Sequence, residues 1–484
     1  MTQGEGMETK DSEGVRDRAS SHAAGEVALR VRGTELVRAN GRSVVLRGVG
    51  LGGWMNMENF ITGYPATESQ QRRALLRALG AEGYRRFFDR FLETFFGPRD
   101  AAFLSSLGMN SVRIPFNYRH FEDDDRPFEL KPEGFDRLDR AVEACAARGI
   151  YTILDLHAVP GAQNQHWHSD NPTHWAQFWT HRHFQDRVVH LWEALADRYK
   201  GNPWVAGFNP VNEPADVSGE VIGPFYRRLE HAIRAVDPEH ILFLDGNRYS
   251  TEFDVLGAPM PNTVYTAHDY ALAGFADSGP YPGVSRGQHV DRTYLERTFR
   301  ARTEYMRRTG TPIWIGEFGP VYTGDTSRDV QRYQLLRDQL EIYQEHGASW
   351  SLWTYKDIGL QGLVQVAPDS PYVERIRPVV EKKARLGVDA WGSVDSGVRH
   401  ILEPIERTFA EEFPDFEPYP WGRQRWIQCL VRNILLAEPL VDDFGRCFEG
   451  LTPGEAEAIA DSFAFERCAV REPLAEILGA VSRS

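Results

Sequence analysis

The sequence contains little cysteine. Only four cysteines occur among 484 residues, and their spacing matches neither a zinc site nor a disulfide scaffold. We therefore expect free thiols at Cys145, Cys429, Cys447 and Cys468.

Long apolar runs are also missing. No stretch reaches the roughly 18 consecutive apolar residues that a membrane-crossing helix needs. The first 26 residues, which begin M-T-Q-G-E-G-M-E-T-K, are polar and charged and lack the apolar block of a secretion signal. These features predict a disordered tail over residues 1–26 and a cytoplasmic protein with no membrane partner.

Positive charge is in deficit. Lysine and arginine total 55 against 69 aspartates and glutamates, which gives a formal net charge of -14. Such a surface should repel nucleic acid and anionic membranes, so neither is expected as a partner. The composition is otherwise globular, and the twelve tryptophans are more than packing alone suggests, since aromatic faces often contact sugar rings. The sequence does not indicate an oligomeric state.

One stretch joins a buried-strand pattern to an acid. Residues 205–214 read V-A-G-F-N-P-V-N-E-P, an apolar run that stops at Asn212 and Glu213. A short apolar run bounded by glycine and proline is typical of a parallel strand covered on both faces, and Pro214 cannot continue a ladder. The pattern predicts that Glu213 lies at the carboxyl end of this strand.

A second stretch has the same organisation. Residues 311–319 read T-P-I-W-I-G-E-F-G, and the β-forming residues end at Glu317 between two glycines. In a parallel barrel the carboxyl ends of the strands share one face, so Glu213 and Glu317 are expected to face each other there. A lone glutamate is most often a surface charge, but two in matching contexts favour a site. Paired carboxylates are the groups that cleave glycosidic bonds.

The other patterns complete an α/β fold, a (β/α)8 TIM barrel with an N-terminal β-hairpin and a C-terminal helical appendage. The hairpin should turn at Asn40-Gly41 and close the bottom of the barrel. Further strands are expected over residues 44–49, 111–117, 151–157, 241–246, 263–270 and 349–357, and helices over residues 82–105, 133–148, 223–237, 291–310 and 327–346. We predict a catalytic barrel with its hairpin over residues 27–383 and a helical extension of unassigned role, packed on the barrel or on another subunit, over residues 384–484.

At its two acidic stretches the chain resembles glycoside hydrolase family 5, the cellulase A family. N-E-P at 212–214 and I-G-E-F-G at 315–319 are similar to the acid/base and nucleophile motifs of that family, and the likeness covers about residues 30–383. The resemblance implies that Glu213 is the acid/base and Glu317 the nucleophile. It also implies that Asn212 holds the 2-hydroxyl of the sugar.

The resemblance extends to the loop after the first strand. Residues 50–59 read G-L-G-G-W-M-N-M-E-N, in which the glycines allow a close approach of the loop, and Trp54 and Glu58 can point into the barrel mouth. This motif is nearest to the exo-β-1,3-glucanase branch, where the matching glutamate binds hydroxyls of the terminal sugar. Glu58 takes that role by resemblance; otherwise it is a solvated loop acid.

Three polar residues, Arg113, Asp155 and His157, interrupt apolar strands. Arg113 interrupts the β-branched run S-V-R-I-P-F-N and, as a buried cation, requires an acid. That acid would be Glu317, which the cation would keep ionised, unless Arg113 belongs to a structural ion pair elsewhere. Asp155 and His157 alternate toward one side of Y-T-I-L-D-L-H. The resemblance makes His157 a ligand of sugar hydroxyls, with a core histidine as the alternative.

Three further residues follow from the resemblance. In T-V-Y-T-A-H-D-Y, His268 would lie beside the acid pair and Tyr270 would hydrogen-bond the nucleophile, or else simply pack with its hydroxyl in water. Trp353 matches the tryptophan on which the sugar in the cleaved position rests.

A loop rich in histidine allows a rival interpretation. Residues 163–183 contain five histidines, but they show no H-E-x-x-H or comparable ligand pattern, so no metal is expected. We instead expect Trp167, Trp175 and Trp179 to line a sugar cleft or to pack within the loop.

The sequence thus predicts a retaining β-glycosidase that needs no cofactor and acts on β-glucosides or β-glucan-type oligosaccharides, in an exo manner. Two alternatives stay open: a transglycosylase on the same fold, and a non-catalytic sugar-binding barrel.

Overall fold

The computed structural model describes residues 27–389 and 391–483. The predicted tail over residues 1–26 lies outside this part of the chain. No helix among the described residues combines the length and hydrophobicity needed to cross a membrane.

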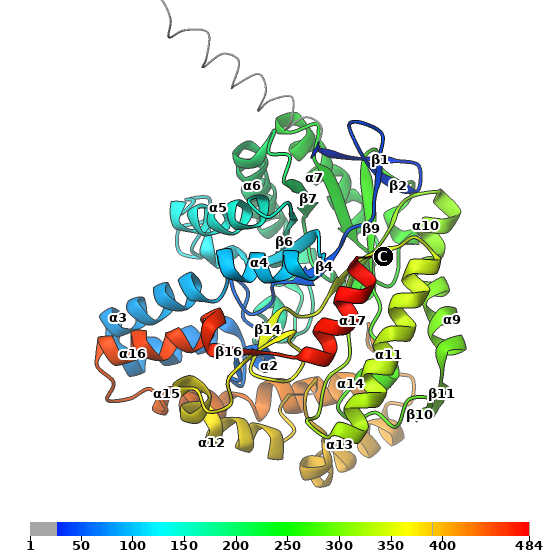
Figure 1. Ribbon diagram of the computed structural model, residues 1–484. Coiled ribbons are helices and arrows are strands. Elements are labelled where there is room, and N and C mark those ends of the chain that lie inside the picture. The colour runs from blue at the N-terminus through cyan, green and yellow to red at the C-terminus, as the bar shows by residue number, and fades with distance from the viewer. Residues whose placement is uncertain (1–26, 390, 484) are drawn as a thin grey trace, which may run out of the picture.

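Eight parallel strands close into a barrel in the order β12-β13-β4-β5-β6-β7-β8-β9, which confirms the predicted TIM-barrel class (Figure 1). The strands are β4 (Arg47–Gly50), β5 (Ser111–Asn117), β6 (Tyr151–Ala158), β7 (Val205–Asn209), β8 (Ile241–Asp245), β9 (Thr263–His268), β12 (Ile313–Phe318) and β13 (Ser349–Leu352). Almost every residue of these strands is buried, because helices cover the outer face and side chains fill the interior.

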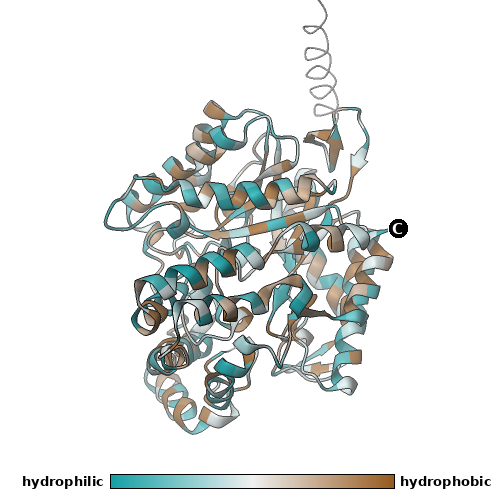
Figure 2. Ribbon diagram, turned by 60° about the vertical axis from the view of Figure 1, so that its left-hand side comes forward, coloured by the Kyte–Doolittle hydropathy of each residue, from teal (hydrophilic) through white to brown (hydrophobic). Residues whose placement is uncertain are grey.

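Two four-residue helices, α2 (Asn59–Thr62) and α8 (Asn247–Ser250), lie in the loops after β4 and β8. Longer helices form the outer ring of the barrel, namely α3 (Glu68–Thr94), α4 (Pro98–Ser106), α5 (Pro132–Ala146), α6 (Arg182–Tyr199), α7 (Ile222–Val236), α9 (Arg292–Arg302), α10 (Glu304–Thr309), α11 (Thr326–Glu345) and α12 (Pro371–Arg385). Polar and apolar residues alternate around these helices, as an outer ring requires (Figure 2). The single helix expected over residues 82–105 is two helices, because Gly97 and Pro98 begin α4 anew, with Asp100 accepting from the Gly97 N–H.

The N-terminal hairpin is a three-stranded antiparallel sheet rather than a two-stranded one. Its strands are β1 (Leu29–Arg32), β2 (Glu35–Arg38) and β3 (Ser43–Val44). The predicted turn at Asn40-Gly41 joins the second and third strands, and an earlier turn at Gly33 joins the first two. Leu29 and Leu36 pack on residues at the amino ends of the barrel strands, so the sheet closes the bottom as expected.

The expected eighth strand over residues 349–357 is interrupted. Strand β13 ends at Leu352, and the chain then pairs elsewhere because the Leu363 and Val364 N–H groups donate to the Thr354 and Tyr355 carbonyls. The result is a separate sheet of β14 (Lys356–Asp357), β15 (Val364–Val366) and β16 (Cys468–Val470).

The C-terminal segment wraps back onto the barrel. It forms α13 (Arg399–Glu412), α14 (Gly422–Gln428), α15 (Glu438–Arg446), α16 (Pro453–Ala460) and α17 (Glu472–Ser482). Helices α15 and α16 lie against α3, and α17 contacts α11 (Figure 1). Phe444, Phe463 and Leu478 belong to the same apolar core cluster as the barrel residues. The C-terminal segment therefore shares the apolar core of the barrel.

Candidate active site

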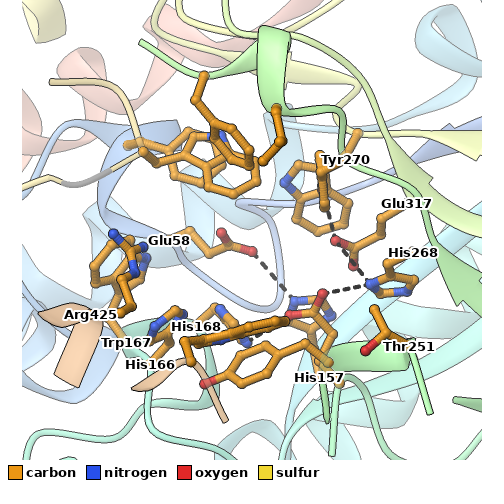
Figure 3. Close-up of a pocket in the computed structure, with 18 of the residues that line it drawn as sticks. Glu58, His157, His166, Trp167, His168, Thr251, His268, Tyr270, Glu317 and Arg425 are labelled. Carbon is orange, nitrogen blue, oxygen red and sulfur yellow. Dashed lines mark hydrogen bonds and ion pairs between the residues drawn. The ribbon is translucent and has the colours of Figure 1, made fainter. Parts of the chain in front are cut away.

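A cavity of about 390 Å³ opens at the carboxyl ends of the barrel strands (Figure 3). Seven of the nine residues that the sequence singled out line it, namely Glu58, His157, Glu213, His268, Tyr270, Glu317 and Trp353. Arg113 and Asn212 are fully buried behind these side chains.

Glu213 sits in a strained turn just beyond β7. The strand ends at Asn209, earlier than the sequence suggested, because Pro210 lacks an N–H for the ladder. The backbone of Glu213 has a φ of 44°, a left-handed conformation that is uncommon for glutamate. Its N–H donates to Asp245 Oδ2 at 2.8 Å, and its carbonyl accepts from Asn164 Nδ2 at 3.0 Å. These two bonds stabilise the turn that aims the carboxyl group into the cavity.

The Glu213 carboxyl group lies between two histidines. His268 Nδ1 is 2.6 Å from Oε1, and His168 Nε2 is 3.2 Å from Oε2. Burial, reinforced by the nearby charge of Asp245, raises the pKa of Glu213 to about 8. Burial lowers the pKa of His268 and of His168. Neutral histidines beside a carboxyl group of raised pKa keep the proton on Glu213 at neutral pH.

Glu317, near the end of β12, is held by donors. Arg113 Nη1 donates to Oε1 at 2.6 Å, and the Tyr270 hydroxyl donates to Oε2 at 2.9 Å, as the sequence predicted. Burial raises the pKa of Glu317 to about 7, although its interactions with His268 and Arg113 oppose that rise. Because two donors favour its ionised form, Glu317 is the member of the pair that loses its proton first.

Arg113 organises the base of the site. Besides Glu317, its guanidinium contacts Asp155 at 3.1 Å and donates to Asn209 Oδ1 at 3.0 Å and to Asn212 Oδ1 at 2.6 Å. Arg113 therefore has both expected roles, because it pairs with Glu317 and also forms a structural ion pair with the buried Asp155. Asn212 Nδ2 lies 3.2 Å from His157 Nε2. The contact of Asn212 with a sugar 2-hydroxyl stays a prediction.

The two glutamates share one small space. A carboxylate oxygen of Glu213, one of Glu317 and a ring nitrogen of His268 all lie within 4.8 Å of one another. The non-catalytic alternative required the acids to be far apart or blocked, whereas both line the same cavity.

Trp353, His157 and Glu58 form another side of the cavity. The Trp353 and His157 rings stack with centroids 5.3 Å apart and planes 5° from parallel. A Cβ at Gly50 or Gly52 would come within 2.6 Å of the Trp353 ring, so this tryptophan needs glycine beneath it, as the loop motif suggested. His157 Nδ1 is 2.7 Å from Asp155 Oδ2, and Nε2 is 3.4 Å from Glu58 Oε1. Burial, with Glu317 and Glu213 nearby, raises the pKa of Glu58 well above its usual range.

Of the tryptophans considered for the mouth, Trp54 lies elsewhere, Trp179 packs within its loop, which was the second expectation for it, and Trp175 does neither. Trp54 is buried in the core, where its Nε1 donates to the Leu92 carbonyl, and Trp179 is buried with its Nε1 bonded to the Gln163 carbonyl. Trp175 is exposed on the outside. Of the histidine-loop tryptophans only Trp167 lines the cavity.

The loop histidines do not converge on one point. His174 Nδ1 faces the Gln165 carbonyl, His181 Nδ1 faces Gln177, and His166 Nε2 faces Cys429 Sγ. In the described ranges, the group whose spacing suits a metal consists of Glu213, His268 and Glu317, with no loop histidine. These are the groups that the sequence assigned to proton and nucleophile chemistry.

Sequence reasoning missed several residues of the site. Asp245 ends strand β8 in I-L-F-L-D, a strand-end acid of the kind that identified the glutamates, and this signal was available. For His168 the sequence pattern suggests only a metal-ligand role, which the structure does not bear out. Trp391, Trp421 and Arg425 line the cavity from the C-terminal segment, where no motif indicated a role.

Comparison with known proteins agrees with this geometry. The model of the cellulase family, glycosyl hydrolase family 5, matches residues 98–359. A beta-xylosidase of Phanerodontia chrysosporium is 49% identical over 465 residues, which are 93% of this chain and 97% of the relative. A probable glucan 1,3-beta-glucosidase A of Aspergillus fumigatus is 29% identical over 360 residues, covering 66% of this chain and 84% of that protein.

Among solved structures, endoglucanase Cel5A of Thermotoga maritima is similar at 21% identity and a TM-score of 0.46, over 55% of this chain and 84% of that chain. Because the family model spans more than half of the chain and a relative is 49% identical along 93% of it, this chain belongs to glycosyl hydrolase family 5 and is a hydrolase of O-glycosyl bonds.

Proposed function

We propose that this chain is a retaining, exo-acting β-glycosidase that releases a terminal glucose or xylose through a glycosyl-enzyme intermediate. One observation carries the proposal: oxygens of Glu213 and Glu317 lie within 4.8 Å of each other. Retaining enzymes hold their carboxyl groups about 5–5.5 Å apart, whereas inverting enzymes leave about 6.5–9.5 Å for a water between them. The spacing here favours direct attack by one carboxylate.

In the first step Glu213 gives its proton to the glycosidic oxygen while Glu317 attacks the anomeric carbon. The C–O bond to the leaving group breaks, an ester bond to Glu317 forms, and the leaving group departs as an alcohol. The environments support these roles, because Glu213 has the higher pKa and Glu317 accepts two hydrogen bonds.

In the second step Glu213, now ionised, takes a proton from water. The resulting nucleophile attacks the anomeric carbon, the ester to Glu317 breaks, and the sugar leaves with its original configuration. Two carboxyl groups and water suffice for the chemistry.

Exo action is supported by aromatic walls near Glu58. Phe60 stacks on Trp391 with ring centroids 5.9 Å apart, and the Tyr270 ring meets the same Trp391 edge-on at 4.7 Å. We infer that these rings end the cavity after one sugar. Glucose and xylose share their ring hydroxyls and differ only in the hydroxymethyl group. The sequence favoured glucosides, and the similar beta-xylosidase adds xylosides.

Azide rescue tests the proposal. Glu317→Gly should lose hydrolysis of aryl β-glucosides and β-xylosides, and added azide should restore turnover with an α-glycosyl azide as product. The aryl glycoside with the higher kcat/KM, β-glucoside or β-xyloside, would identify the preferred sugar. Normal hydrolysis by Glu317→Gln would refute the proposal.

Transglycosylation is the second candidate. Trp167, Tyr249 and Trp421 line the cavity and offer aromatic surface to an acceptor that would replace water in the second step. Product analysis with and without an added acceptor alcohol decides between the two outcomes.

A further inference from the structure

One cation at the cavity wall lacks an acidic partner. Arg425, on α14, lines the cavity, yet within residues 27–389 and 391–483 its guanidinium makes no hydrogen bond or ion pair. The other two arginines of the lining are paired: Arg286 with Asp277 at 2.7 Å and Arg302 with Asp269 at 2.5 Å. Figure 3 shows Arg425 beside His166 and Trp167, across the cavity from His268.

The fold does not need the Arg425 charge. Helix α14 is anchored by Ile427, which is buried with Leu402 and Val431, and by Trp426, which contacts Phe409 and Phe416. Since packing holds the helix, the half-buried guanidinium is left available to a ligand.

Aromatic residues connect Arg425 to the proposed acid. His168 contacts Glu213, and its ring lies 6.1 Å from that of Tyr249, which in turn lies 5.6 Å from the ring of Trp421. His166 completes the group, with its ring 5.1 Å from Tyr249. Burial, together with the charge of Arg425, lowers the pKa of His166 well below its usual range, so no second cation forms there.

The position of these residues assigns them to the leaving group. Glu213 protonates the glycosidic oxygen, so the departing half of the substrate lies on the outer side of Glu213, away from Glu58, His157 and Trp353. From Glu213 a series of contacts runs through His168 and Tyr249 to Trp421, and Arg425 lines the same cavity across from His268 (Figure 3).

We propose that Tyr249, Trp421 and Arg425 form a leaving-group subsite that selects a planar aglycone carrying a carboxylate. A single guanidinium matches a singly charged carboxylate through two parallel hydrogen bonds, and the tryptophan, whose side chain is 41% exposed, offers a flat apolar surface. This proposal rests on the proposed glycosidase function and adds the chemistry of its aglycone.

A matched substrate pair tests the subsite. The kcat/KM of a 4-carboxyphenyl β-glycoside is divided by that of the 4-carbamoylphenyl β-glycoside, which has a similar shape and no charge. In Arg425→Gln this ratio should fall by about 10-fold or more, the expected effect of losing charge-assisted hydrogen bonds. Comparing this ratio between the parent and Arg425→Gln cancels the intrinsic difference in reactivity between the two phenol leaving groups. Arg425→Lys should keep part of the preference.

Arg286→Gln is the matched control, because Arg286 lines the same cavity but is paired with Asp277. Its ratio should equal that of the parent. An unchanged ratio in Arg425→Gln, or an equal fall in both variants, would overturn the proposal.

Calorimetric binding of 4-hydroxybenzoate and 4-hydroxybenzamide separates this proposal from the enzymatic one. The carboxylate should bind the parent more tightly than the amide and lose that advantage in Arg425→Gln. Such binding without turnover of any glycoside would refute the proposed glycosidase function and keep the subsite. Turnover without a carboxylate preference would refute the subsite and keep the glycosidase function.

Discussion

Glu213 and Glu317 lie within 4.8 Å of each other, yet their surroundings differ in kind. Glu213 leaves its strand in a left-handed turn and contacts two neutral histidines, while Glu317 stays on its strand and accepts hydrogen bonds from Arg113 and Tyr270. Burial raises the pKa to about 8 for Glu213 and to about 7 for Glu317, and of the two it is Glu317 that is bonded to an arginine and a tyrosine hydroxyl. Two identical side chains thereby acquire different proton affinities, which is how one site supplies both an acid and a nucleophile.

Replacing each glutamate with glutamine should give the largest effects, and the two variants should differ. Glu317→Gln should lose activity by several powers of ten on every aryl glycoside, because no bond to the anomeric carbon can form. Glu213→Gln should lose roughly 10²–10⁴-fold on substrates whose leaving group needs a proton. It should lose far less in the first step with 2,4-dinitrophenyl glycosides, whose leaving group departs unprotonated. Burst kinetics across a leaving-group series measure this contrast, and equal losses for both variants would contradict the assigned roles.

Tyr270→Phe should impair the nucleophile Glu317 and leave the acid Glu213 unchanged. Removing a hydrogen bond to a carboxylate should lower kcat by about 10-fold and raise the pKa of Glu317, moving the acidic limb of the pH profile upward. Tyr249→Phe is the control, because its hydroxyl bonds Gln165 and not Glu317. An acidic limb that moves in neither or in both variants would refute the role of Tyr270.

Asp245→Asn should shift the pKa of Glu213 and leave that of Glu317 unchanged, with a smaller effect on rate. In the parent, kcat/KM should fall below about pH 7, as Glu317 becomes protonated, and above about pH 8, as Glu213 loses its proton. The charge of Asp245 disfavours the ionised form of Glu213, so its removal lowers that pKa and moves the alkaline limb to lower pH. The acidic limb serves as the internal control. An alkaline limb that stays in place would show that Asp245 does not tune the acid.

The sequence predicted those parts of the site that local pattern determines. Apolar and β-branched runs located all eight barrel strands and both glutamates, and an isolated buried arginine correctly indicated a partner in Glu317. The ends of the strands were predicted less accurately. Pro210 ends β7 before Asn212 and Glu213, and the chain after Leu352 pairs with β15.

What failed depended on distant contacts. Trp54 is in the core, where its Nε1 donates to the Leu92 carbonyl, a contact that no local pattern reveals. Arg425 reaches the cavity because α14 packs beside the barrel mouth, and its charge is notable because no acid within residues 27–389 and 391–483 pairs with it.

The configuration of the first-formed sugar tests the central claim most directly. Hydrolysis of an aryl β-glycoside followed by proton NMR in the first minutes, before the anomers equilibrate, should show the β-anomer. Initial release of the α-anomer would mean that water attacks the substrate directly, and would contradict a covalent intermediate on Glu317.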